Sequence, residues 1–147
     1  MKNVITFLCT VLVLGSCNTE SSRAIFHKTH EPKKSEAPFS DAVQVGNLFF
    51  LSGQVGMDHN TRKLVPGGIK AETTQTLENI KSVLEHHDMQ MKDVVKCTVI
   101  LSDIDDFSAF NAIYKTYFPQ KPARTTFAAK GLAVRAKIEI ECIAVKQ

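Results

Sequence analysis

The chain has 147 residues, which is the length of one domain with a sizeable core. Its 44% hydrophobic and 22% charged residues are ordinary for a globular domain. The formal net charge is only +3, and no Lys/Arg cluster is interleaved with aromatic residues, so the sequence argues against a nucleic-acid partner.

The N-terminus has the pattern of a bacterial lipoprotein signal. Lys2 precedes an apolar run from Val4 to Leu14, which is too short to span a bilayer, and Leu-Gly-Ser follows directly before Cys17. We expect residues 1–16 to be a signal peptide with a lipobox and Cys17 to carry lipid. The alternatives are a plain secretory signal or a buried first strand with an incidental cysteine. The lipid anchor predicts a place in the bacterial cell envelope, on the periplasmic or outer-membrane side, with no other membrane contact.

The segment after Cys17 is polar and offers hardly any apolar side chain for a core. We therefore expect residues 17–36 to be the lipidated cysteine and a flexible tether, and residues 37–147 to be the folded domain. His27 and His30 lie in this segment without further ligands, so no metal site is expected.

Two further cysteines, Cys97 and Cys142, occupy strand positions among Val, Ile and Ala. A free cysteine in such surroundings usually behaves as a small buried hydrophobe. A disulfide between them is open in an oxidising compartment, but it needs a geometry that sequence does not supply. Two buried thiols are the favoured interpretation.

Hydrophobic periodicity predicts the elements of the domain. Both helices carry an apolar stripe, and in the first helix Asn79 lies one residue off this stripe, at the expected boundary with a sheet. The order strand, strand, helix, strand, helix, strand, strand predicts an α+β fold with a single mixed β-sheet and two helices on one face. The predicted elements are strands 42–45 and 48–52, helix 69–87, strand 93–101, a helix capped by Asp105 and ended by Pro119, and strands 125–129 and 135–145.

The last strand has a regular alternation. One face carries Ile138, Ile140, Cys142 and Ala144, and the other carries Glu139, Glu141, Ile143 and Val145. Several strands offer apolar residues on both faces, although the helices are expected to cover only one. The second face would be a large apolar patch in water, which predicts that it is buried against other copies of the chain.

Four stretches together resemble one protein family, and they occur in its order. They are Pro38 to Val43, Leu51-Ser-Gly-Gln54, Phe107 to Phe118, and the closing pair Pro-Ala-Arg124-Thr-Thr and Ile-Glu139-Ile-Glu-Cys-Ile-Ala. This pattern resembles the RidA (YjgF) family of imine/enamine deaminases over about residues 37–147. The resemblance implies a homotrimer whose sheets pack into a barrel-like centre, with active sites in the clefts between subunits.

The resemblance also implies roles for individual residues. Arg124 matches the arginine that binds the substrate carboxylate, and a guanidinium suits this role because it is planar and permanently charged. Glu139 matches the glutamate that activates water, since a carboxylate in a partly desolvated cleft can shift its pKa toward neutrality. Ser52 and Asn111 match positions that line the same cleft. The implied substrate is a small 2-imino or 2-oxo acid, and no cofactor is implied.

Three positions depart from the family pattern. Phe39 stands where a Tyr is usual, so a hydroxyl contact is lost. Thr126 stands where several members carry Cys, and Leu132-Ala133 replaces the usual Leu-Pro. We expect Phe39 and Thr126 to border the substrate and to affect substrate choice and rate.

Two other interpretations remain open. Arg124, Glu139 and Glu141 would also suit a structural salt-bridge network between subunits without catalysis. A tethered envelope protein would also suit a non-catalytic module that captures small carboxylates in the same clefts.

Overall fold

The computed structural model describes residues 23–147 of the chain. The predicted hairpin, helices and later strands are present with shifted end points, and β1, β4 and β5 are additional. In chain order the elements are β1 (Ile25–His27), η1 (Pro32–Lys34), β2 (Ala42–Val45), β3 (Leu48–Val55), β4 (Met57–Asp58), β5 (Lys63–Leu64), α1 (Gly68–His86), η2 (Met91–Asp93), β6 (Val94–Leu101), η3 (Ile104–Asp106), α2 (Phe107–Tyr117), β7 (Ala123–Ala128), η4 (Ala133–Arg135) and β8 (Ile138–Val145).

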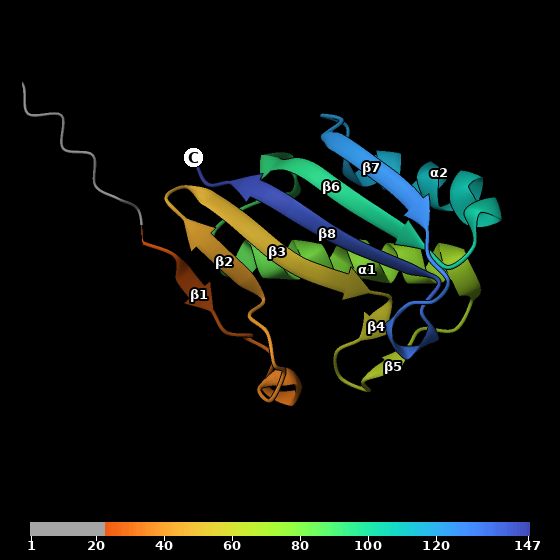
Figure 1. Ribbon diagram of the computed structural model, residues 1–147, viewed down its shortest axis with the longest axis horizontal. Helices are drawn as coiled ribbons and strands as arrows, with labels where there is room; N and C mark the ends of the chain where they lie inside the picture. The colour runs from red at the N-terminus through yellow and green to blue at the C-terminus, as the bar shows by residue number, and fades with distance from the viewer. Residues whose placement is uncertain (1–22) are drawn as a thin grey trace, which may run out of the picture.

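Six strands form the main sheet, in the spatial order β1-β2-β3-β8-β6-β7. The β6–β7 pair is parallel, and the other neighbouring pairs are antiparallel. Figure 1 shows α1 and α2 together behind this sheet, with the short β4–β5 hairpin beyond the end of β3. The predicted class, a mixed sheet with two helices on one face, is confirmed.

The core lies between α1 and the sheet. Helix α1 begins after Gly67, whose φ of 115° is a conformation that favours glycine. The sheet presents the predicted face of β8 to the helices, and the alternation is confirmed because those side chains are buried while Glu139 and Glu141 are not. The buried side chains of α1 and β8 include Leu77, Ile80, Val83, Leu84, Ile138, Ile140, Cys142 and Ala144.

Helix α2 begins at Phe107, so the prediction that Asp105 caps it is wrong. Asp103 Oδ1 accepts a hydrogen bond from the Asp105 N–H at 3.0 Å and thereby caps the 3-10 turn η3 instead. The helix continues directly from this turn, and it buries Phe110 and Tyr114 against the sheet.

Residues 23–36 are folded, so the predicted tether and the domain boundary at residue 37 are wrong over this segment. β1 adds to the sheet edge by pairing with β2, with Phe26 opposite Val43. This edge strand is held by backbone hydrogen bonds and by polar side chains. The prediction of a tether considered only how few apolar residues the segment has, so it missed these interactions. Within β1, His27 Nε2 lies 3.0 Å from Gln44 Oε1 on β2, and after the strand the imidazole of His30 stacks on His86 with ring centroids 4.5 Å apart. Cys17, the signal peptide and residues 18–22 lie outside the described residues.

The sheet face opposite the helices is covered by no helix of residues 23–147 (Figure 1). Its exposed and half-buried apolar side chains come from four strands; they are Leu48, Phe50, Ile100, Phe127, Ile143 and Val145. Phe50 is 42% exposed and Phe127 is 45% exposed, which leaves an unusually apolar surface in a single copy. Within residues 23–147, no helix combines the length and apolar content needed to cross a membrane.

Candidate functional site

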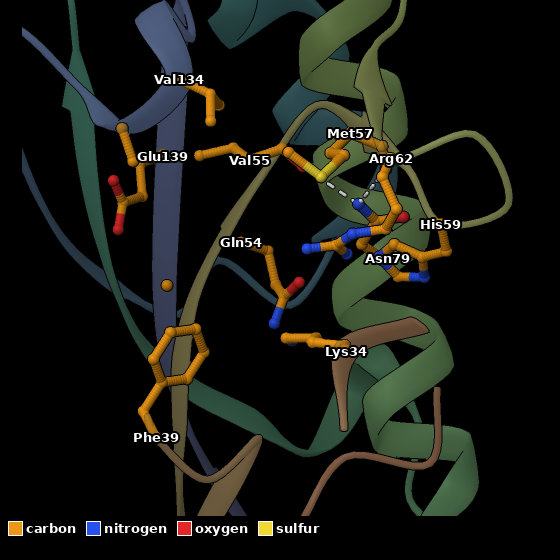
Figure 2. A pocket seen from close by; sticks show the side chains of 12 residues that line it. Lys34, Phe39, Gln54, Val55, Met57, His59, Arg62, Asn79, Val134 and Glu139 are labelled. Carbon is orange, nitrogen blue, oxygen red and sulfur yellow. Dashed lines mark hydrogen bonds between the residues drawn. The ribbon is translucent and has the colours of Figure 1, made fainter. Parts of the chain in front are cut away.

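A cavity of about 260 Å³ lies where the ends of β3 and β8 meet the β4–β5 hairpin and η4 (Figure 2). Glu139, the second residue of β8, lines it from the side opposite Arg62 and His59. The cavity is lined by Lys34, Phe39, Gly53, Gln54, Val55, Met57, His59, Arg62, Asn79, Ala133, Val134 and Glu139.

Glu139 owes its position to two features of neighbouring elements. β3 changes register against β8 between Leu51 and Gln54, and Gly53 lies in this bulge. A Cβ atom at Gly53 would overlap Glu139 Oε1, so any other residue there would displace the carboxylate from this position. In addition, Glu72 Oε2 accepts a hydrogen bond from the Lys137 N–H at 2.7 Å, which ties α1 to the start of β8.

The carboxyl group of Glu139 is electrostatically perturbed. Burial raises the pKa of Glu139 above its ordinary value, and the negative charge of Glu141 raises it further. Among the described residues, no Lys, Arg or His side-chain nitrogen lies within 4.0 Å of the Glu139 carboxylate oxygens. A carboxyl group with a raised pKa and no paired cation is suited to take up a proton and return it during a reaction.

Asn79 fixes the opposite corner of the cavity. Its Nδ2 donates to Val55 O at 3.0 Å and to Met57 O at 2.9 Å, while its Oδ1 accepts from Gln75 Nε2 at 2.8 Å. The expectation that Asn79 reaches the helix–sheet boundary is confirmed. This buried amide holds the chain where β3 turns into β4, so it shapes the cavity and is fully engaged in doing so.

The same cavity has a charged wall that sequence reasoning missed. Lys34, His59 and Arg62 line this side of the cavity. The two cations have acidic partners that do not line it. Lys34 Nζ donates to Asp41 Oδ1 at 2.5 Å, and Arg62 Nη1 lies 3.8 Å from the Glu31 carboxylate. Burial lowers the pKa of His59, although Glu31 opposes this change. The segment that carries Lys34 was interpreted as a tether, which is why this wall was not anticipated.

Phe39 and Ser52 take different roles. Phe39 lines the cavity with its ring 5.5 Å from Lys34 Nζ, and 52% of its surface is exposed. The Ser52 hydroxyl donates to Ser40 O at 2.6 Å, and the Ser52 N–H donates to Asp41 O at 3.0 Å. Ser52 therefore fixes the segment that carries Phe39, and its hydroxyl proton is already used.

Arg124 lies in a second cavity, of about 270 Å³, between β7 and α2. Its Nη1 donates to Asn111 Oδ1 at 2.7 Å, and its guanidinium carbon lies 4.6 Å from the centre of the Tyr114 ring. Lys115 and Lys121 also line this cavity, so it attracts anions. The predicted neighbours Arg124 and Asn111 are thus together, and the guanidinium keeps further N–H donors for a carboxylate.

Thr126 points to the same side of β7 as Arg124, two residues along the strand. It is half-buried, and its Oγ1 has no hydrogen-bond partner among the described residues. Thr126 lines neither cavity.

Arg124 and Glu139 do not meet within one copy of the chain. Arg124 is in register with Cys97 and Cys142, whereas Glu139 is in register with Ile100. The two residues are therefore offset by three residues along the strands and by two strands across the sheet, about 14 Å in total, and they point to opposite faces. The carboxylate and imine groups of one small imino acid are a few bonds apart and cannot span this distance.

Comparison with known proteins shows a consistent group of relatives. Residues 28–146 match the family described as Endoribonuclease L-PSP. The chain is 44% identical over 110 residues to the 2-iminobutanoate/2-iminopropanoate deaminase of Mus musculus, which covers 74% of this chain and 82% of the mouse protein.

Solved structures show the same fold. RidA from an Antarctic Psychrobacter species superimposes with a TM-score of 0.76 at 34% identity, over 82% of this chain and 98% of that one. The E. coli YjgF protein superimposes with a TM-score of 0.76 at 31% identity, over 84% of this chain and 99% of that one.

Proposed function

The chain belongs to the endoribonuclease L-PSP family, which includes the RidA and YjgF proteins, and on this premise we propose that it is an imine/enamine deaminase. Its proposed reaction is the hydrolysis of small 2-imino or enamino acids to 2-oxo acids and ammonia. The mouse relative at 44% identity, named for 2-iminobutanoate and 2-iminopropanoate, supports this class of substrate.

The observation that carries the proposal is the state of Glu139. Its carboxyl group lies in a cavity, over a glycine that makes room for it, with a pKa raised by burial and by Glu141. A residue kept only for a salt bridge would have a cation beside it and a lowered pKa. Within one copy of the chain, the described residues place no such cation beside Glu139, and this setting supports proton transfer; the ion pair between subunits is the alternative that the Glu139→Gln variant tests.

The mechanism uses one water molecule. Glu139 accepts a proton from this water as its oxygen bonds to the C=N carbon, and it returns the proton to the nitrogen. In the resulting carbinolamine, Glu139 takes the hydroxyl proton and passes it to the amino nitrogen. The C–N bond then breaks, ammonia leaves, and the former hydroxyl oxygen becomes the oxo group. Arg124, held by Asn111 and by the Tyr114 ring, binds the substrate carboxylate through two parallel N–H···O bonds.

We propose that this site forms between copies of a homotrimer. Arg124 and Glu139 lie too far apart within one copy, and the sheet face that bears Glu139 is apolar and uncovered by helices. Packing these faces together would bury Phe50 and Phe127 and would bring Glu139 of one copy toward the Arg124 cavity of another.

The test is turnover of 2-iminopropanoate generated in the assay from alanine by an amino-acid oxidase. The full chain should accelerate ammonia release over the uncatalysed hydrolysis. Glu139→Gln should lower kcat by about a hundredfold or more and leave pyruvate binding nearly unchanged, whereas Arg124→Lys should weaken pyruvate binding. A folded parent protein that binds pyruvate without accelerating ammonia release would instead be a carboxylate-binding module.

A further inference from the structure

Two cysteine side chains in the core are closer than packing alone requires. Cys97 on β6 and Cys142 on β8 are directly opposite each other in the antiparallel ladder, and their Sγ atoms are 3.3 Å apart. Both are free thiols, and both are buried. The favoured expectation of two buried thiols is confirmed, and their proximity carries a further consequence.

The backbone already has the spacing of a disulfide. Residues directly opposite in an antiparallel pair have Cα atoms about 4.5–5.5 Å apart, which lies within the range of about 4.4–6.8 Å found for disulfide-bonded cysteines. Closing the two sulfurs to about 2.05 Å requires a movement of roughly 1.2 Å, which side-chain rotation with a small strand adjustment can supply.

We propose that Cys97 and Cys142 form a reversible oxidation site, in which a peroxide converts the thiol pair into a cross-strand disulfide. The proposed deaminase chemistry does not use this pair. Hydrogen peroxide is the oxidant of choice because it is small and uncharged, so it can enter a protein interior during local opening.

The two thiols differ in a way that sets the order of the steps. Hydrogen bonding from the Cys142 thiol lowers the pKa of Cys97 despite burial, and the Tyr114 hydroxyl and the Arg124 charge act in the same direction. The same thiol pair, together with burial, raises the pKa of Cys142. Arg124 lies directly opposite Cys97 in the β6–β7 pair, whereas Cys142 lies one strand further away, so the guanidinium charge favours the thiolate of Cys97. Cys97 is therefore assigned as the nucleophile, and Cys142 as the thiol that resolves the intermediate.

The chemistry balances with one peroxide molecule. The Cys97 sulfur attacks one peroxide oxygen, the O–O bond breaks, and a sulfenic acid and one water form. The Cys142 sulfur then attacks the sulfenic sulfur; the S–S bond forms, the S–O bond breaks, and the hydroxyl leaves with the thiol proton as a second water. The two thiols are oxidised by two electrons, and the peroxide is reduced to two waters.

The experiment treats the native full-length chain with hydrogen peroxide, blocks remaining thiols in denaturant, and digests with trypsin. Peptide mass spectrometry then separates this pair from Cys9 and Cys17, which lie in another tryptic peptide. The expected product is a disulfide-linked pair of the peptides Cys97–Lys115 and Ile138–Lys146, and a thiol reductant should separate it. Since the bond closes a separation of 45 residues, the oxidised protein should melt on the order of 10 °C higher than the reduced protein.

Two single variants test the order of steps. In Cys142→Ala, Cys97 should stop at the sulfenic acid and be trapped by dimedone, whereas in Cys97→Ala, Cys142 should stay reduced. Trapping at Cys142 in place of Cys97 would overturn the assignment of the nucleophile. The whole proposal fails if the parent protein keeps both thiols free at peroxide concentrations that oxidise its half-buried Met57 and Met91, or if the linked peptides form only after unfolding.

Discussion

At the scale of single residues, the two side chains that the sequence singled out differ in their electrostatic settings. Arg124 contacts the Asn111 amide and the Tyr114 ring, and since neither is negatively charged, its own charge stays available to an anion. Glu139 is partly buried and lies near Glu141, and both the burial and the second negative charge disfavour its ionised form. The sequence pattern placed both residues in strand-like stretches, and the structure has both on strands, whereas their functional roles came from the family resemblance and stay predictions. The Gly53 bulge that accommodates Glu139 depends on register, and sequence alone does not give register.

The raised pKa of Glu139 has a consequence for stability. An acid whose pKa is higher in the folded state binds its proton more tightly there, so its contribution to the free energy of unfolding falls as pH rises from about 4.5 through the folded-state pKa. Glu139→Gln should therefore melt at the same temperature as the parent below about pH 4 and at a higher temperature near pH 7. Thermal melts across this pH range measure the difference. A lower melting temperature at pH 7 would indicate the structural ion pair instead.

A methyl group at Gly53 should act on Glu139 and leave most of the fold alone. The added Cβ would occupy the place of Glu139 Oε1, so Gly53→Ala should push the carboxylate away from its position and lower kcat by about tenfold or more. Gly131, where a Cβ would meet nothing within 4 Å, gives the matched control, and Gly131→Ala should keep the parental rate. Equal rates for the two variants would contradict the proposed placement of Glu139.

At the scale of elements, the N-terminal segment is where prediction and structure differ most. The helices and central strands follow from hydrophobic periodicity because each buries an apolar face. β1 and η1 are held mainly by backbone pairing, imidazole stacking and charge pairs, which leave no periodic signal. Glu31 and Lys34 are buried although both are charged, and composition-based reasoning places such residues in solvent.

Removing the charge of Lys34 should test how firmly this segment is bound. Asp41 is 1% exposed and its nearest basic groups are the Lys34 ammonium at 2.5 Å and the His30 imidazole at 3.8 Å, so Lys34→Met removes the permanent charge beside a buried carboxylate. The free energy of unfolding should fall by about 3 kcal/mol or more, as measured by urea denaturation. Lys33→Met is the matched control because Lys33 is exposed, and its effect should stay within about 0.5 kcal/mol. If Lys34→Met left the free energy of unfolding unchanged, the N-terminal segment would be bound only loosely.

At the scale of the whole molecule, a shared site predicts complementation between two inactive variants. In mixed trimers of Glu139→Gln and Arg124→Ala copies, some interfaces would combine the intact Arg124 of one copy with the intact Glu139 of another. Random co-assembly should restore about a quarter of the parental turnover, while each variant alone stays inactive. Refolding the two variants together and assaying ammonia release measures this. Light scattering that gives a monomer mass at micromolar concentration would rule out both the trimer and the shared site.

The predicted lipid anchor is tested separately because it lies outside the described residues. The full chain should appear in the membrane fraction through lipid on Cys17, and Cys17→Ser should release it or stall removal of the signal peptide. Fractionation and intact-mass measurement show this directly. A Cys17→Ser protein that is still processed and membrane-bound would show that the interpretation of Leu-Gly-Ser-Cys as a lipobox is wrong.

The folded β1 strand also limits how the protein could stand on a membrane. Between Cys17 and Ile25 there are seven residues, which span at most about 25 Å even when fully extended. A lipid on Cys17 would therefore keep the domain close to the bilayer surface, within the reach of this short segment. In a cyclic trimer, three such segments would leave from points related by the threefold axis, so together they would hold that axis perpendicular to the bilayer.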